Sequence, residues 1–137
     1  MRLIRDRISR EDGVAAVEFA IILPVLALIL FGVLEFGRVW SQYQVFQGAA
    51  REGARCAAVA STSDCDPVTQ IENAAEPYSP QGPFSISVNG QNAPDGCTDA
   101  DAGEDVQVSW DQPLRVNIPF WKDVTVTSTI KAVFRCE

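Results

Sequence analysis

Residues 13–35 read GVAAVEFAIILPVLALILFGVLE, an apolar run with one charged residue ahead of its final glutamate. As a helix, residues 14–34 measure about 30 Å, which is the thickness of the hydrocarbon core of a bilayer. We therefore expect a transmembrane helix over residues 14–35. The charged residue is Glu18, and a carboxylate costs about 2.5–3.5 kcal/mol at the centre of a bilayer and less near an end. Glu18 is thus a candidate functional residue that requires a partner.

The composition indicates one small polar domain beyond this helix. The chain has 137 residues, a formal net charge of −7 and no histidine. An acidic chain lacks the basic surface that nucleic acid requires, so we expect no nucleic-acid partner. The absence of histidine excludes Ser-His-Asp and Cys-His catalysis, and no pair of carboxylates stands out. We therefore expect neither an enzyme nor a cofactor.

Residues 1–13 form a short leader with four arginines directly ahead of the apolar run. Because positive residues favour the cytoplasmic side, we expect a cytoplasmic N-terminus and a single-pass chain with its C-terminus outside. The four cysteines then lie in an oxidising compartment, where disulfides form. A secretory signal peptide is disfavoured because the apolar core is much longer than about 7–15 residues.

Gly13 stands at the boundary between the leader and the apolar run, with Glu18 five positions beyond it. This pattern resembles the class III signal of type IV pilins and pseudopilins. Residues 13–55 look more closely like the TadE-like family of minor pseudopilins from tight-adherence (Tad, Flp-type) pilus systems. The motifs that carry the likeness are Glu18-Phe19, Leu23-Pro24, Glu35-Phe36-Gly37-Arg38 and Ala50-Arg51-Glu52-Gly53-Ala54-Arg55. The resemblance says little about residues 61–137.

The resemblance implies that a prepilin peptidase cuts after Gly13 and makes Val14 the new N-terminus. It implies a location in the bacterial inner membrane, with the C-terminal domain in the periplasm, and a role in assembly or initiation of a Tad pilus. The implied partners are other pilin or pseudopilin subunits, the inner-membrane assembly platform, the prepilin peptidase and membrane lipid.

Two alternatives remain open at this point. The same N-terminal pattern suits a pseudopilin of a type II secretion or competence system. If Gly13 and Glu18 are coincidental, the chain is instead a signal-anchored extracellular binding or surface protein.

A physical reason connects the cleavage site with the carboxylate. Cleavage after Gly13 creates an α-amino group on Val14, and Glu18 of a neighbouring subunit would neutralise it, so that assembly removes two charges that are costly in lipid. Glu18 would otherwise pair within its own chain or extend to the membrane interface. Pro24 removes one backbone hydrogen bond inside the span and is expected to kink the helix.

The helical pattern continues over residues 36–60, which we expect to extend the helix beyond the membrane. Apolar residues recur there at helical spacing, large ones first and small ones later. This stripe consists of Val39, Tyr43, Phe46, Ala50, Gly53, Ala57 and Ala60. We expect residues 36–48 to pack against other subunits and residues 50–60 to pack against the chain's own domain. Arg38 lies off the stripe and is expected to be a solvated charge.

Residues 61–137 are expected to form a small periplasmic α+β domain. Asp66 and Pro67 form a capping pattern that predicts a short helix, which ends before Pro77. Alternating apolar residues predict a small antiparallel sheet, packed on the end of the long helix. The predicted strands span residues 84–88, 106–110, 114–120 and 124–134. Pro119 interrupts the third. The expected fold class is therefore α+β and pilin-like, with a long N-terminal membrane-spanning helix.

The cysteines are expected to link this domain by two disulfides. Cys56 and Cys65 bracket the end of the long helix, Cys97 lies in a loop, and Cys136 ends the last strand. We predict the pairs Cys56–Cys65 and Cys97–Cys136, although three connectivities are open from sequence alone.

The loop at residues 94–105, PDGCTDADAGED, is rich in carboxylates. Asp95, Asp99 and Asp101 are weak candidates for calcium ligands because calcium prefers oxygen donors. The spacing does not match an EF-hand, and a solvated acidic loop without a metal is the favoured interpretation.

Overall fold

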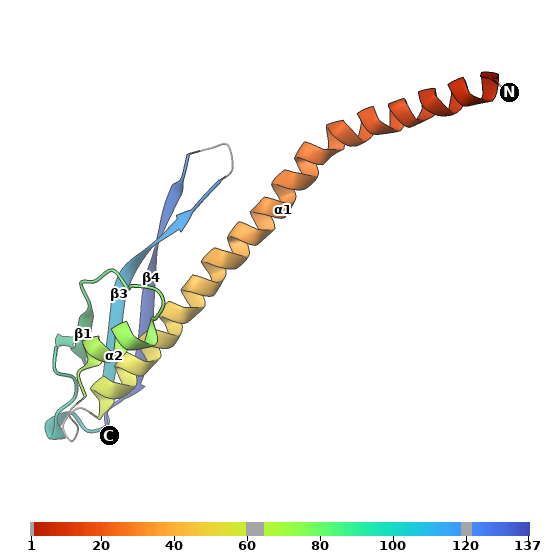
Figure 1. Cartoon of the computed structure of the whole chain (residues 1–137). Coiled ribbons are helices and arrows are strands. Elements are labelled where there is room, and N and C mark those ends of the chain that lie inside the picture. The colour runs from red at the N-terminus through yellow and green to blue at the C-terminus, as the bar shows by residue number, and fades with distance from the viewer. Residues whose placement is uncertain (1, 60–64, 119–121) are drawn as a thin grey trace.

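The computed structural model describes residues 2–59, 65–118 and 122–137. Figure 1 shows a long helix, α1, whose C-terminal part packs against a small sheet while its N-terminal part extends away from the domain. The expected α+β class, with a long apolar N-terminal helix and a small antiparallel sheet, is confirmed.

Helix α1 spans Arg2–Ala58. It is longer than predicted, because residues 2–13 of the leader are also helical and form its first turns. The helix also continues through Pro24, and Figure 1 shows it bending in its N-terminal half. One proline removes one bond of the helical ladder, so the turns on either side of it still hold the helix together. The predicted end at residue 60 lies outside the described residues.

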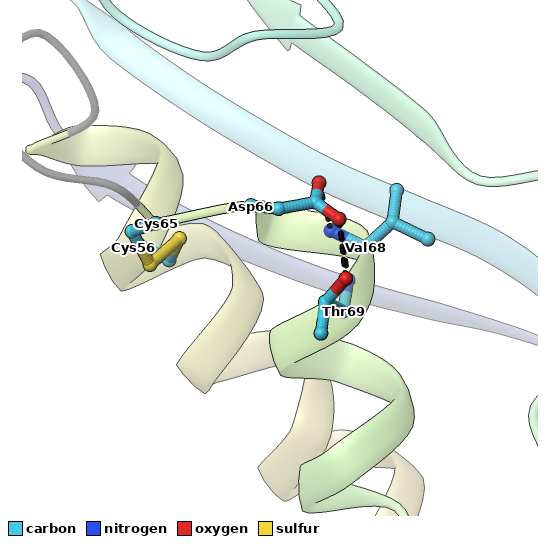
Figure 2. Close-up of a disulfide and its surroundings, with 5 residues drawn as sticks. All are labelled: Cys56, Cys65, Asp66, Val68 and Thr69. Atoms are coloured by element: carbon cyan, nitrogen blue, oxygen red, sulfur yellow. Dashed lines mark hydrogen bonds between the residues drawn. A yellow bond between two sulfur atoms is a disulfide. The ribbon is translucent and has the colours of Figure 1, made fainter.

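Helix α2 (Pro67–Ala74) begins where the capping pattern predicts. The Asp66 carboxylate accepts hydrogen bonds from the backbone N–H of Val68 at 3.3 Å and of Thr69 at 3.2 Å (Figure 2). The Thr69 hydroxyl also donates to this carboxylate, and together these bonds hold the pKa of Asp66 below its usual value. The cap fixes the chain direction directly after Cys65.

The sheet has four antiparallel strands in the order β2-β1-β3-β4. Their bounds are Ser85–Val88 for β1, Gln91–Asn92 for β2, Asp105–Val116 for β3 and Val124–Arg135 for β4. Asn89 and Gly90 both have positive φ angles, 48° and 77°, which is the turn geometry that closes a two-residue hairpin between β1 and β2.

The predicted strands at residues 106–110 and 114–120 are one strand, β3, and their separation was wrong. The strand passes through Pro113 because β1 pairs with β3 only as far as Ser109, which leaves β4 as the one neighbour at the proline. A strand with a free edge tolerates a residue that lacks an N–H group. Strand β3 ends at Val116, and the predicted interruption at Pro119 lies outside the described residues.

Strand β4 has the predicted alternation, but only part of its apolar face is buried. Ile130 and Ala132 lie in the core, whereas Val124 and Val126 are 43% and 50% exposed. Figure 1 shows the reason, since α1 diverges from the β3–β4 pair toward the end that holds Val124. Apolar surface therefore remains open on this face of the sheet.

The core lies between the C-terminal part of α1, helix α2 and one face of the sheet. Phe46 is only 3% exposed, and Val39 and Tyr43 pack against the same core. The expectation that residues 36–48 pack on other subunits was therefore wrong for Phe46. Ala50 and Gly53 are buried in the chain's own domain, as expected.

Both predicted disulfides are present, Cys56–Cys65 and Cys97–Cys136. The first links the end of α1 to the start of α2 (Figure 2). The second links the loop before β3 to the residue after β4. Gly96 lets this loop lie directly on α1: its φ is 85°, and a Cβ there would come within 2.8 Å of the Cα of Ala57.

Gly53 offers a test of how tightly the two helices pack. A Cβ at Gly53 would overlap the buried side chain of Ile71 and lie 3.2 Å from the Pro67 carbonyl. We expect Gly53→Ala to lower the free energy of unfolding of the domain by about 1–3 kcal/mol. Thermal unfolding of the full chain in detergent, followed by near-ultraviolet circular dichroism, measures the change.

Gly48→Ala is the matched control, because Gly48 is exposed on the same helix and a Cβ there would meet nothing within 4 Å. It should stabilise the helix by about 0.5–1 kcal/mol. Equal stabilisation by both changes would contradict the close approach of α1 to α2.

Candidate membrane and assembly surface

The first part of α1 presents an apolar surface that no other described part of the chain covers. Its large apolar side chains from Val14 to Phe36 are between 47% and 71% exposed. The helix is long and apolar enough to cross a membrane, and none of its most apolar stretch is buried. Length, composition and exposure together are consistent with single-pass membrane anchoring.

The predicted processing and pairing residues lie at the N-terminal end of this surface. Gly13 is exposed within the helix, and a Cβ placed there would have no neighbour within 4 Å. Glu18 lies about one turn beyond Val14. Its side chain is exposed and forms no hydrogen bond or ion pair with any residue that the structure describes. Glu18 therefore still requires a partner from outside the described residues if it lies in a membrane.

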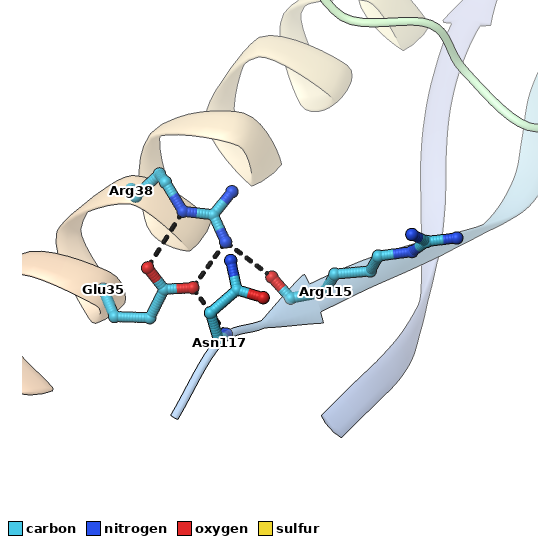
Figure 3. Close-up of polar contacts among 4 residues, drawn as sticks. All are labelled: Glu35, Arg38, Arg115 and Asn117. Atoms are coloured by element: carbon cyan, nitrogen blue, oxygen red, sulfur yellow. Dashed lines mark hydrogen bonds and ion pairs between the residues drawn. The ribbon is translucent and has the colours of Figure 1, made fainter. Parts of the chain in front are cut away.

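A polar cluster lies where the apolar surface ends. Arg38 donates to the Glu35 carboxylate through Nε at 3.0 Å and through Nη2, and the same Nη2 donates to the Arg115 carbonyl at 2.8 Å. The Asn117 N–H donates to Glu35 at 2.7 Å. Figure 3 shows both α1 side chains facing the backbone at the end of β3. The hydrogen bonds of this ion pair to Arg115 and Asn117 connect the helix to the end of β3.

Arg38 is not the ordinary solvated charge that the sequence predicted: its side chain is 39% exposed, but it pairs with Glu35 and bonds to the Arg115 carbonyl. Its spacing from Glu35, three positions along one helix, is a signal for an ion pair that is readable from sequence. No sequence pattern indicates the other two bonds, because Arg115 is 77 positions from Arg38 and Asn117 is 82 positions from Glu35.

A groove of about 260 Å³ lies beside this cluster, between α1 and the end of β3. Glu35 and Asn117 line one end of it and bond to each other. The rest of its lining is apolar apart from Gly32. The apolar lining residues are Leu28, Phe31, Phe36, Val39, Val116 and Ile118.

The acidic loop at residues 94–105 contains the three candidate calcium ligands. Among the residues that the structure describes, no group of three Asp, Glu or Cys side chains is placed to hold a metal ion. Asp101 instead accepts hydrogen bonds from Thr98, from the hydroxyl at 2.6 Å and from the N–H at 2.8 Å. These bonds lower the pKa of Asp101 and cap the short 3-10 helix at Asp99–Asp101. Asp95, Asp99 and Asp101 are therefore not supported as calcium ligands.

The fold and this surface are consistent with a membrane-anchored α+β protein: one exposed apolar helix, whose Glu35–Arg38 ion pair is hydrogen-bonded to a small domain with two disulfides. Residues 13–55 match the family model described as TadE-like protein, which confirms the resemblance drawn from the motifs. The match associates the chain with pilus components in general. It starts at Gly13, includes Glu18, Glu35 and Arg38, and ends before the sheet. No curated protein and no solved structure matches the chain.

Proposed function

We propose that this protein is a minor pseudopilin that acts in assembly or initiation of a Tad pilus. A prepilin peptidase cuts it after Gly13, and residues 14–35 hold it in the inner membrane until it joins other subunits. The sheet domain lies in the periplasm. The protein performs no chemical step itself, and its partners are pilin or pseudopilin subunits, the assembly platform and the peptidase.

The observation that carries the proposal is the combination of an exposed apolar helix with a carboxylate near its start, Glu18, that pairs with no residue the structure describes. The helix must be covered by lipid or by other helices, because its large apolar side chains are at least 47% exposed from Val14 to Phe36. Glu18 must also find a counter-charge in that environment. The α-amino group of Val14 in an adjacent subunit would supply it at the moment of assembly. The family match supports this interpretation, since it begins at Gly13.

Replacement of Glu18 tests the assembly role. Glu18→Leu should insert in the membrane and be cleaved normally, because the change makes the span more apolar. Incorporation into pili should fall at least about tenfold, since an unpaired charge in lipid costs more than 1.4 kcal/mol. The measurement is the amount of the protein in sheared pili relative to the membrane fraction.

Glu52→Leu is the matched control, because Glu52 is an exposed glutamate on the same helix beyond the apolar surface. It should assemble as the unmodified chain does. Normal incorporation of Glu18→Leu would remove the pairing hypothesis.

A further inference from the structure

The sheet domain reaches back along α1 to the level of the membrane span. One wall of the groove contains Leu28 and Phe31, which belong to the apolar span, and the other contains Val116 and Ile118. Leu28 lies about 9 Å along the helix before Leu34, the last apolar residue of the span. Ile118 therefore lies beside a part of α1 that is inside the bilayer when residues 14–34 cross it.

The span cannot shift to keep the groove in water. If Leu28 and the residues after it lay outside, residues 14–27 would have to cross the membrane alone, and that helix is only about 21 Å long against a core of about 30 Å. The large apolar side chains from Leu28 to Leu34, which are 48% to 69% exposed, would also remain in water. Both costs disappear when the end of β3 enters the adjacent leaflet.

The membrane-side end of the β3–β4 pair is apolar on the face that contains the groove. Val116 pairs with Val124, and Leu114 pairs with Val126. Val124, Val126 and the nearby Ile118 are 43%, 50% and 40% exposed. The next residues of β4 on the opposite face are threonines. One face of this end therefore needs an apolar covering, and the other suits water.

Two backbone groups at this end of β3 have hydrogen-bond partners within the protein, as an environment with little water requires. Lipid cannot satisfy backbone groups, so polar groups near it need protein partners. On the edge of β3 that has no strand beside it, the Arg115 carbonyl and the Asn117 N–H bond to Arg38 and Glu35. The Arg115 side chain points away from these partners (Figure 3) and forms no ion pair with a described residue. Its guanidinium is free to bind a phosphate.

We propose that the membrane-side end of the β3–β4 pair is a second membrane contact. Acyl chains of phospholipids in the adjacent leaflet fill the groove and cover Ile118, Val124 and Val126, while Arg115 binds lipid phosphate. The position of the groove favours an acyl chain, because Leu28 and Phe31 of its lining belong to the span, which lipid of the adjacent leaflet surrounds in a bilayer. The proposal requires only that residues 14–34 span a bilayer, and it does not depend on the pilus role.

The test measures the depth of single labels on the full chain. Ile118→Cys and, separately, Val126→Cys carry an NBD fluorophore in nanodiscs of phosphatidylethanolamine and phosphatidylglycerol, prepared with one chain per disc. Val133→Cys is the matched control, because Val133 is an apolar β4 residue of similar exposure, 47%, on the opposite face and near the far end. Near-ultraviolet circular dichroism verifies that each labelled chain is folded.

We expect a blue-shifted emission at positions 118 and 126, with iodide quenching about tenfold weaker than at 133, because ions are excluded from hydrocarbon. Equal quenching at all three positions would overturn the proposal. Protection that occurs only in discs holding several chains would also overturn it and would assign the groove to a second copy. Neither result would bear on whether the protein is cleaved or assembled.

Discussion

A Gly13→Leu variant should accumulate in the membrane as the full-length chain and should not enter pili. A protease has to bring its own atoms close to the backbone of the bond that it cuts, and glycine leaves that backbone open. Gly13 is exposed on α1, so a leucine there would not disturb the fold of this chain. We expect a nearly complete loss of the processed form on immunoblots of cells that contain the Tad machinery.

Gly37→Leu is the control for this result. It places the same side chain at another exposed glycine of α1 that has no neighbour within 4 Å. Its processing should match that of the unmodified chain. A processed Gly13→Leu chain beginning at Val14 would show that glycine is not required at the junction.

The second large effect is expected on stability, from removal of the Cys97–Cys136 disulfide. The two cysteines are 39 positions apart, and both are about 4% exposed. For a closed loop of about 40 residues the chain-entropy model gives about 3.9 kcal/mol. The double variant Cys97→Ala/Cys136→Ala should lower the free energy of unfolding by about that amount, which is a large part of the stability of a small domain. Denaturant unfolding of the full chain in detergent measures it.

The other disulfide supplies an internal comparison. Cys56 and Cys65 are only nine positions apart, so their double alanine variant should lose about 2.7 kcal/mol. An equal or smaller loss on removal of Cys97–Cys136 would contradict the view that this bond stabilises the domain by closing the longer loop.

The features that local sequence signals describe were predictable. The long apolar helix follows from the length of one apolar run, the start of α2 from Asp66 before Pro67, and the first strand from alternation. The Cys56–Cys65 pair followed from the placement of these two cysteines on either side of the end of α1. In each case, the residues that carry the signal are close together in the chain.

The features that depend on distant neighbours were not predictable. Pro113 is a strand breaker by type, and only the absence of β1 beside it explains why β3 passes through. Val126 looks like a core residue in the pattern, but α1 diverges before it reaches that part of the sheet. Likewise, the role of Arg38 depends on a backbone carbonyl 77 positions away.

The N-terminus of the protein in cells with an active Tad system decides whether the chain is a processed pseudopilin. Intact-mass analysis of the chain purified from the membrane and from sheared pili determines this end directly. The proposed function predicts a chain that begins at Val14 in both fractions. A chain that retains Met1 or any part of the leader, in cells that make normal pili, would contradict it.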